Sequence, residues 1–154
     1  MIYEKIASDL KGLYERSSVN HGMLVMEARA DSLLALIRRL KDDFAFDLFL
    51  DVTAVDYPQR QLRFEVVYHL YSSSHRKRIR LKVPVGQGQA RMPTLTHLYG
   101  SARYMEREVH EMYGIRFAGN NDLRPILLYE GFDGHPLRKD YPMDREQPLV
   151  KYRK

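Results

Sequence analysis

The segment from His75 to Val85 reads HRKRIRLKVPV and carries the clearest structural pattern in this chain of 154 residues. Every second residue from Ile79 to Val85 is aliphatic, and basic residues or proline occupy the positions between them. A period of two is typical of a β-strand with one buried face. The alternation therefore predicts a strand whose apolar side must be covered by another part of the chain.

Neighbouring segments extend this strand into a sheet. Phe49 to Val55 and Leu62 to Tyr71 are predicted strands, and the turn residues Tyr57 to Arg60 between them indicate a hairpin. Met23 to Ala28 is a further short apolar stretch that is consistent with a strand. Because the connections between the later strands are short, we expect antiparallel pairing.

Two N-terminal segments repeat apolar residues at helical spacing. The first predicts an amphipathic helix over about the first 16 residues, with Ile6 and Leu10 on its apolar face. The second begins after Asp31, a potential N-cap, and places Leu33 and Ile37 on one face. These faces can cover the predicted strands. We therefore expect a two-layer α+β fold, in which two N-terminal helices pack on a mostly antiparallel sheet of four or five strands.

A third helix is predicted between Ser101, a potential N-cap, and Gly114, which suits the left-handed position that ends a helix. Four later prolines prevent long helices, so the chain beyond Gly114 is expected to be extended. We divide the chain into an α+β core domain (1–100), the third helix with an extended docking segment of the same domain (101–142), and a short basic tail (143–154).

The composition limits the classes of chemistry. The chain has no cysteine, which excludes a disulfide, a thiolate nucleophile and cysteine-held zinc or iron–sulfur sites. No apolar run approaches the roughly 20 residues that span a bilayer, and the N-terminus lacks the apolar core of a secretory leader. The net charge of +5 favours anionic partners such as nucleic acid, lipid headgroups or an acidic protein surface. The basic residues from His75 to Lys82 form either a solvated face or such a docking surface.

Histidines and carboxylates near the third helix do not form a recognisable catalytic motif. His110 and Glu111 begin like a zincin motif, but Gly114 stands where the second histidine belongs. Glu108 and Glu111 can still be considered as ligands of a hard cation. His135 is expected to fix a turn by bonding to the backbone. On residue chemistry alone, a catalytic site is not expected.

Short motifs between residues 50 and 142 occur in an order that carries further information. They are Asp51-Val52-Thr53-Ala54-Val55-Asp56, Arg80-Leu81-Lys82-Val83-Pro84-Val85, Glu106-Arg107-Glu108 with Glu111-Met112-Tyr113, Asp122-Leu123-Arg124, Ile126-Leu127 and Gly134-His135-Pro136-Leu137-Arg138-Lys139-Asp140-Tyr141-Pro142. In this order they closely resemble the 30-kDa subunit family of respiratory complex I, which is the C subunit in the bacterial NADH-quinone oxidoreductase.

The chain departs from that family pattern at three places. Gly119-Asn120-Asn121 stands where Gly-His-Pro is usual, Pro125 replaces a common basic residue, and Tyr104-Met105 replaces a frequent pair with tryptophan. The chain is also short for the family. These departures concern local contacts, whereas the order of the motifs is retained.

The resemblance implies a noncatalytic subunit of the hydrophilic arm of complex I, docked against the 49-kDa-type subunit that helps form the quinone site. It implies no cofactor or metal in this chain, because FMN and the iron–sulfur clusters belong to partner subunits. Electron transfer from NADH to quinone would drive ion translocation in the assembled enzyme. The implied location is the cytoplasmic face of the bacterial inner membrane, and no nucleic acid is expected as a partner.

Our interface hypothesis assigns the stretch from Glu106 to Tyr141 to contacts with neighbouring subunits. The assigned residues are Glu106, Arg107, Glu108, Glu111, Asp122, Arg124, His135, Arg138, Lys139, Asp140 and Tyr141. Arginine and lysine side chains in this set would face acidic groups of the partners. Two alternatives remain open: the equivalent subunit of a membrane-bound hydrogenase or related dehydrogenase, and a nucleic-acid-binding module suggested only by the basic strand and a pI near 9.4.

Overall fold

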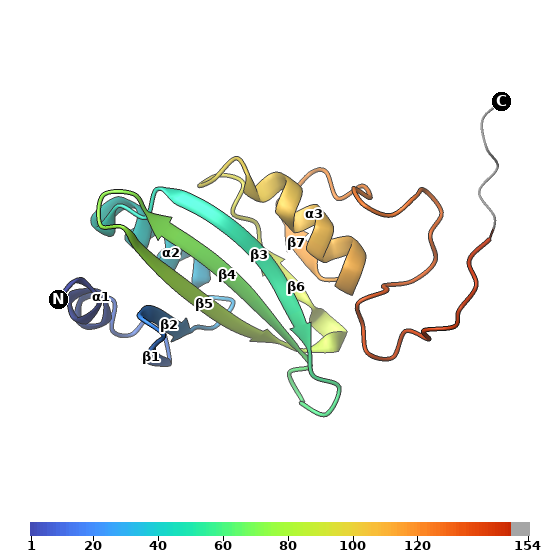
Figure 1. Cartoon of the computed structure of the whole chain (residues 1–154), viewed down its shortest axis with the longest axis horizontal. Coiled ribbons are helices and arrows are strands. Elements are labelled where there is room, and N and C mark those ends of the chain that lie inside the picture. Colours follow the sequence, from blue (N-terminus) through green and yellow to red (C-terminus); the bar gives the residue numbers. More distant parts are fainter. Residues whose placement is uncertain (149–154) are drawn as a thin grey trace.

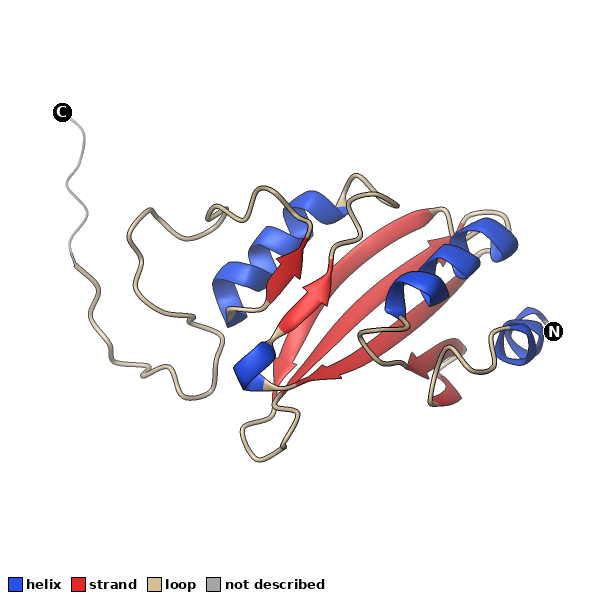
Figure 2. Ribbon diagram, turned by 180° about the vertical axis from the view of Figure 1, so that it is seen from behind, coloured by secondary structure: helices blue, strands red, loops and turns tan. Residues whose placement is uncertain are grey.

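The computed structural model describes residues 1–148 and consists of a five-stranded sheet with helices and a small second sheet packed on it (Figures 1 and 2). The strand order of the large sheet is β1-β2-β5-β4-β3, and β6 pairs with β7 in the small sheet. The elements are α1 (Ile2–Asp9), β1 (Arg16–Asn20), β2 (Met23–Glu27), α2 (Leu33–Phe44), β3 (Leu48–Asp56), β4 (Phe64–Ser72), β5 (Lys77–Val85), η1 (Gln87–Gln89), β6 (Arg91–Pro93), α3 (Ala102–Tyr113) and β7 (Arg116–Ala118).

Strand β5 confirms the prediction made from the alternating segment. The side chains of Ile79, Leu81 and Val83 are fully buried, whereas Arg78 and Lys82 on the opposite face are exposed or half-buried. The whole strand pairs with β4 in antiparallel register, and the predicted hairpin of β3 and β4 is also present. Burying each large aliphatic side chain contributes about 1.5–3 kcal/mol, so this face forms the centre of the core.

The covering layer comes from all three helices, which confirms the expected α+β fold. Helix α2 supplies the largest share, and Figure 2 shows it lying across the strands. Helix α1 adds Ile6, its C-cap Leu10 packs beside it, and α3 adds Ala102 and Val109 to the same hydrophobic core. The third helix is therefore part of the core packing. The residues that α2 buries are Leu33, Leu36, Ile37, Leu40 and Phe44.

The N-terminal prediction is wrong in one respect. Helix α1 ends at Asp9, well before residue 16, and Gly12 with φ of 99° lies in the turn that follows. The next segment forms β1, which the sequence did not predict. All five β1 residues are exposed, so the sequence RSSVN carries no apolar alternation by which a strand can be recognised.

One strand pairing differs from the antiparallel expectation. Strand β2 pairs in parallel with β5, and the other three pairings of the large sheet are antiparallel. The register places Leu24 beside Ile79 and Met26 beside Leu81, so the apolar residues of both strands face the helices. Parallel neighbours need a long crossover, and α2, β3 and β4 provide it here. The starts of β2 and β5 consequently lie at the same end of the sheet.

The predicted boundaries of the second and third helices are correct to within one or two residues. Ser32 is the N-cap of α2, and the expected N-cap Asp31 pairs instead with Arg29 at 2.5 Å. Helix α3 begins after Ser101 and ends at Gly114, as predicted. Gly114 has φ of 76° and donates its N–H to the carbonyl oxygen of His110 at 2.8 Å. Among residues 1–148, no helix is both long and apolar enough to cross a membrane.

Candidate subunit-docking surface

The chain after β7 runs through residues 119–142, which we call the C-terminal segment, and it contains no helix or strand (Figure 1). Such a path leaves many backbone donors and acceptors without partners from secondary structure. Side chains of α3 and of the large sheet supply those partners. The contacts fall into two groups, one at residues 122–128 and one at residues 135–140.

The Glu111 carboxylate holds the first group through three backbone amides. It accepts hydrogen bonds from the N–H groups of Ile126 at 3.0 Å, Leu127 at 2.8 Å and Leu128 at 3.2 Å. Glu111 is buried, yet its charge is satisfied because ionised acceptors form strong bonds with N–H donors. These amides leave Glu111 little free capacity to act as the cation ligand considered from the sequence.

Arg107 fixes the same loop from one turn earlier on α3. Its guanidinium donates to the carbonyl oxygens of Arg124 and Pro125, both at 2.8 Å. Arg124 in turn forms a two-point ion pair with Asp122, with distances of 2.8 and 2.9 Å. Hydrogen bonds from Arg124 hold the pKa of the Asp122 carboxyl well below its usual range. The planar guanidinium of Arg107 presents its donors in a fixed fork, which suits the two carbonyl oxygens of Arg124 and Pro125.

This arrangement presents apolar side chains to solvent on a fixed backbone. Ile126 is 41% exposed and Leu127 is 64% exposed, although the amides of both residues are bound to Glu111. Leu137, farther along the C-terminal segment, is 49% exposed. Exposed apolar groups gathered on one rigid segment are typical of a protein–protein contact. The sequence pointed to the charged residues as the interface and did not single out these three.

The second group centres on Arg63, which joins the C-terminal segment to the end of the sheet. Arg63 donates to both carboxylate oxygens of Asp56 at 2.7 Å and to Asp140 at 2.9 Å. The amide of Lys139 also donates to Asp56 at 2.7 Å. The Arg63 hydrogen bond lowers the pKa of Asp56, and the same pairing raises the pKa of Arg63. Asp56 lies in the Asp51–Asp56 motif, but nothing in the sequence linked that motif to residues 139 and 140.

Two more predicted interface residues have partners within the chain. Arg138 donates from Nε to the carbonyl oxygen of Tyr113 at 2.6 Å, and its guanidinium lies 5.3 Å from the ring centre of Phe64. His135 bonds through Nδ1 to the carbonyl oxygen of Glu111 at 2.9 Å, which agrees with its expected bonding to backbone. Burial lowers the pKa of His135. A Cβ atom at Gly114 would lie only 2.7 Å from His135 Nε2, so this close approach needs glycine.

Glu106 is placed differently from what its charged neighbours suggested. The interface hypothesis assigned Glu106 to a contact with a neighbouring subunit, but Glu106 is fully buried within the chain. It accepts hydrogen bonds from the Thr94 hydroxyl and the Leu95 amide, both at 2.7 Å, and from the Asn120 side chain at 2.9 Å. Burial raises the pKa of its carboxyl. Glu106 therefore ties the start of the C-terminal segment to the loop before α3.

The predicted interface set thus divides by exposure. Glu108, Arg124, Lys139 and Asp140 are exposed, and their contact with another subunit stays a prediction. The side chains that are buried or half-buried support the C-terminal segment from within or lie beside it. They are Glu106, Arg107, Glu111, Asp122, His135, Arg138 and Tyr141. Within residues 1–148, no group of three or more His, Asp or Glu side chains is arranged to hold a metal ion.

Comparison with known proteins identifies the family. A model of the family "Respiratory-chain NADH dehydrogenase, 30 Kd subunit" matches residues 26–147. The C subunit of the NADH-quinone oxidoreductase of Sinorhizobium medicae is 49% identical over 129 residues, which cover 82% of this chain and 64% of the relative. Its counterpart from Rhodopseudomonas palustris is 42% identical and covers 91% of this chain and 69% of that protein. The chain thus spans about two thirds of the length of these relatives.

Solved structures agree with this assignment. A trypsin-resistant fragment of Nqo5 superposes with a TM-score of 0.72 at 30% identity, covering 80% of this chain and all of the fragment. A chain of the membrane-bound sulfane sulfur reductase, an archaeal respiratory membrane complex, superposes with a TM-score of 0.80 at 27% identity, covering 98% and 96% of the two chains. By the match to its model, by these relatives and by this fold, the chain belongs to the 30-kDa subunit family of the respiratory-chain NADH dehydrogenase.

Proposed function

We propose that this chain is a noncatalytic subunit in the peripheral arm of an NADH-quinone oxidoreductase, and that its C-terminal segment docks against the 49-kDa-type subunit. The observation that carries the proposal is the fixed, exposed pair Ile126 and Leu127 above the Glu111 carboxylate. Membership of the family indicates a multi-subunit complex, and the exposed pair offers a surface to which a partner can bind.

The geometry favours docking because the binding surface is organised before the partner arrives. A loop that becomes ordered only on association reduces the affinity of the complex. The hydrogen bonds from Arg107 and to Glu111 already order residues 124–128 in the free chain, so this cost does not arise on docking. Apolar side chains near the centre of an interface contribute most of its affinity. Glu108 on α3 and Arg124, two residues before Ile126, are also exposed, and their charges favour a partner of complementary charge.

The redox chemistry in this proposal belongs to the partner subunits. FMN and iron–sulfur clusters there would carry electrons from NADH to quinone, and quinone reduction would drive ion translocation. This chain would hold neighbouring subunits in position at the cytoplasmic face of the cell membrane. Its own contribution is structural, because the carboxylates of Glu106 and Glu111 are already occupied by donors of the same chain.

Substitution of Leu127 tests the docking proposal. We expect Leu127→Asp to reduce co-purification of the 49-kDa-type subunit with the tagged chain from solubilised membranes by at least about tenfold, since it removes an apolar contact and buries a charge. Leu34→Asp is the matched control, because Leu34 is 37% exposed in the first turn of α2, where an acidic residue is tolerated.

The outcomes are distinct. Unfolding of the Leu127→Asp variant is not expected, so circular dichroism of the isolated chain should match that of the parent. Loss of the 49-kDa-type partner with Leu127→Asp and its retention with Leu34→Asp would support the proposal. Full recovery of that partner with Leu127→Asp would contradict it.

A second candidate is a subunit of a related membrane complex that does not oxidise NADH. The observation that favours it is the likeness to a chain of the sulfane sulfur reductase, which extends over nearly the whole of both chains. Membrane-bound hydrogenases and related dehydrogenases fall in the same class of alternatives. Mass spectrometry of the purified complex separates the two candidates, because only an NADH-oxidising assembly should contain an FMN-binding partner subunit. Only that assembly should also reduce quinone with NADH.

A further inference from the structure

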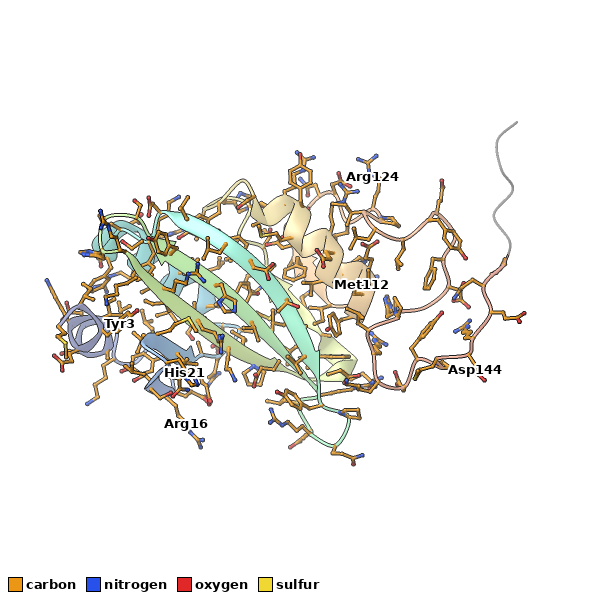
Figure 3. All side chains as sticks on the ribbon, viewed as in Figure 1. Tyr3, Arg16, His21, Met112, Arg124 and Asp144 are labelled. Carbon is orange, nitrogen blue, oxygen red and sulfur yellow. The ribbon has the colours of Figure 1, made fainter. Side chains whose placement is uncertain are left out.

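The basic motif at residues 75–78 has no part in the docking surface, and the parallel pairing of β2 and β5 places it beside another turn. The turn at His21 and Gly22 precedes β2, and the turn that ends at Arg76 precedes β5. Because parallel strands start at the same end of a sheet, the two turns lie next to each other. Figure 3 shows Tyr3 and His21 at this end, far from Met112 and Arg124.

A cleft of about 360 Å³ lies between these turns. Basic and aromatic side chains make up most of its lining, together with Gly22 and Met23, and no carboxylate lines it. The basic and aromatic residues are Tyr3, His21, Tyr71, Arg76, Lys77 and Arg78. The arginines and Lys77 are exposed and have no ion-pair partner among residues 1–148.

The Asp47 carboxylate is bonded to the turn between β4 and β5. Asp47 accepts hydrogen bonds from the amide and the hydroxyl of Ser73 at 2.8 and 2.6 Å. These bonds tie Asp47 to the turn between β4 and β5, and Asp47 is not among the residues that line the cleft. Like charges this close repel one another, so an anion in the cleft would be favoured.

The floor of the cleft is fixed by Tyr3. Its hydroxyl lies 2.9 Å from the carbonyl oxygen of Arg78 and 3.3 Å from that of Gly22, so it links the starts of β5 and β2. The ammonium group of Lys77 lies 5.7 Å from the centre of the Tyr3 ring, which is within the range of a cation–π contact. The cations consequently lie on a defined surface that joins α1 to two strands.

Backbone conformation shows how the two turns beside the cleft are built. His21 has φ of 50° and Arg76 has φ of 51°, which is the left-handed region that favours glycine or asparagine. Positive φ at His21 and at Gly22 is what the two-residue hairpin turn between β1 and β2 requires. Both residues line the cleft.

We propose that this cleft binds a phosphate group. A phosphate carries more than one negative charge on a compact tetrahedron, and the guanidinium groups of Arg76 and Arg78 can each donate two hydrogen bonds to it. Lys77 and His21, which also line the cleft, can add single donors. The phosphate can belong to a lipid headgroup or to a soluble phosphorylated compound, and both present the same chemistry.

Arg76→Asn and Arg78→Gln test the proposal with the full chain. Asparagine tolerates φ near +50°, so Arg76→Asn removes the charge without adding backbone strain, and its melting temperature should equal or exceed that of the parent. Arg38→Gln, on the exposed side of α2, removes the same charge elsewhere and serves as the control.

Binding of inorganic phosphate is followed by amide chemical shifts at constant ionic strength. We expect saturable shifts at residues 21–23 and 76–78, weakened about tenfold by either cleft variant and unchanged by Arg38→Gln. A parallel arm measures sedimentation with vesicles that contain phosphatidic acid, against neutral vesicles. Saturable phosphate binding with vesicle binding indicates a headgroup, and phosphate binding alone indicates a soluble compound.

Three results would overturn the proposal. The first is the absence of saturable shifts with phosphate in the parent chain. The second is equal weakening by Arg38→Gln and by the cleft variants, which would indicate only the net charge of the protein. The third is binding to single-stranded nucleic acid without any response to phosphate, which would indicate an extended polyanion surface.

Discussion

The large sheet and the C-terminal segment are both held in one conformation, but by different forces. The sheet depends on apolar burial, since Ile79, Leu81 and Val83 are completely enclosed. The C-terminal segment depends on a few charged side chains, chiefly Glu111, Arg107 and Arg63, that bind its backbone or its carboxylate. Apolar burial is spread over many residues, whereas each charged contact here fixes several backbone positions. The segment can therefore be released by single substitutions that leave the sheet folded.

Arg63 is the point at which the two regions meet, and its substitution should have the largest effect. We expect Arg63→Ala to lower the free energy of unfolding by about 3–5 kcal/mol, because Asp56 would keep a buried charge without its partner. Urea denaturation measures the change. Asp140→Asn is the control, since the exposed Asp140 should contribute no more than about 1 kcal/mol. A small effect of Arg63→Ala would show that the segment and the sheet are joined by other contacts.

Leu81→Ala should weaken the sheet without releasing the C-terminal segment. The variant leaves a cavity at a fully buried position, so the free energy of unfolding should fall by about 2–4 kcal/mol. The amides of residues 126–128 should exchange at the same rate in the variant as in the parent chain. This holds as long as local opening there needs less free energy than global unfolding. Faster exchange at these amides in the native variant would mean that the two regions unfold together.

Glu111→Gln should do the reverse. The amide side chain keeps one acceptor oxygen but loses the negative charge that binds three N–H groups. We expect exchange of the Ile126, Leu127 and Leu128 amides to accelerate about tenfold, with the urea midpoint nearly unchanged. Glu108→Gln, an exposed neighbour on α3, should leave both quantities at their parent values. Equal acceleration in both variants would remove the special role of Glu111.

Acid should act with opposite sign on two carboxyl groups that hold the C-terminal segment, Asp122 and Glu106, and the change in stability should be the smallest of those expected. Hydrogen bonds from Arg124 lower the pKa of Asp122 from its ordinary value of 3.8. Their contribution to the stability of the fold is therefore fully present above pH 3.8, and it is lost as the pH falls through the lowered pKa. The pKa of Glu106 is raised by burial above 4.5, so its protonation at a higher pH relieves an unfavourable buried charge. Carboxyl carbon chemical shifts should show Glu106 titrating before Asp122 as acid is added. The opposite order would contradict the assigned environments.

Sequence reasoning succeeded where a pattern is local. The alternation in β5, the hairpin before it and the glycine that ends α3 all depend on neighbouring residues, and each is present as predicted. Strand β1 was missed because its residues are polar and exposed. The parallel pairing of β2 with β5 was missed because it depends on a crossover that no local pattern records.

The candidate site shows the same limit. The motif order located the stretch from Glu106 to Tyr141, but it could not separate side chains that face outward from those that support the loop. Glu106 and Glu108 are two positions apart in a charged cluster, and only the fold buries the first and exposes the second. The sequence showed Ile126 and Leu127 only as part of a motif, since nothing there reveals that their amides are bound to Glu111 while their side chains are exposed.

The parallel pairing of β2 and β5 also has a consequence for the order in which the chain can fold. Residues 16–27 are made early in synthesis, but their neighbour in the sheet is made only after α2, β3 and β4. The meander of β3, β4 and β5 contains only short-range pairings and can form by itself, whereas the first hairpin must wait for a long loop to close. On the ribosome, the N-terminal strands would therefore be the last part of the sheet to gain protection, although they emerge first.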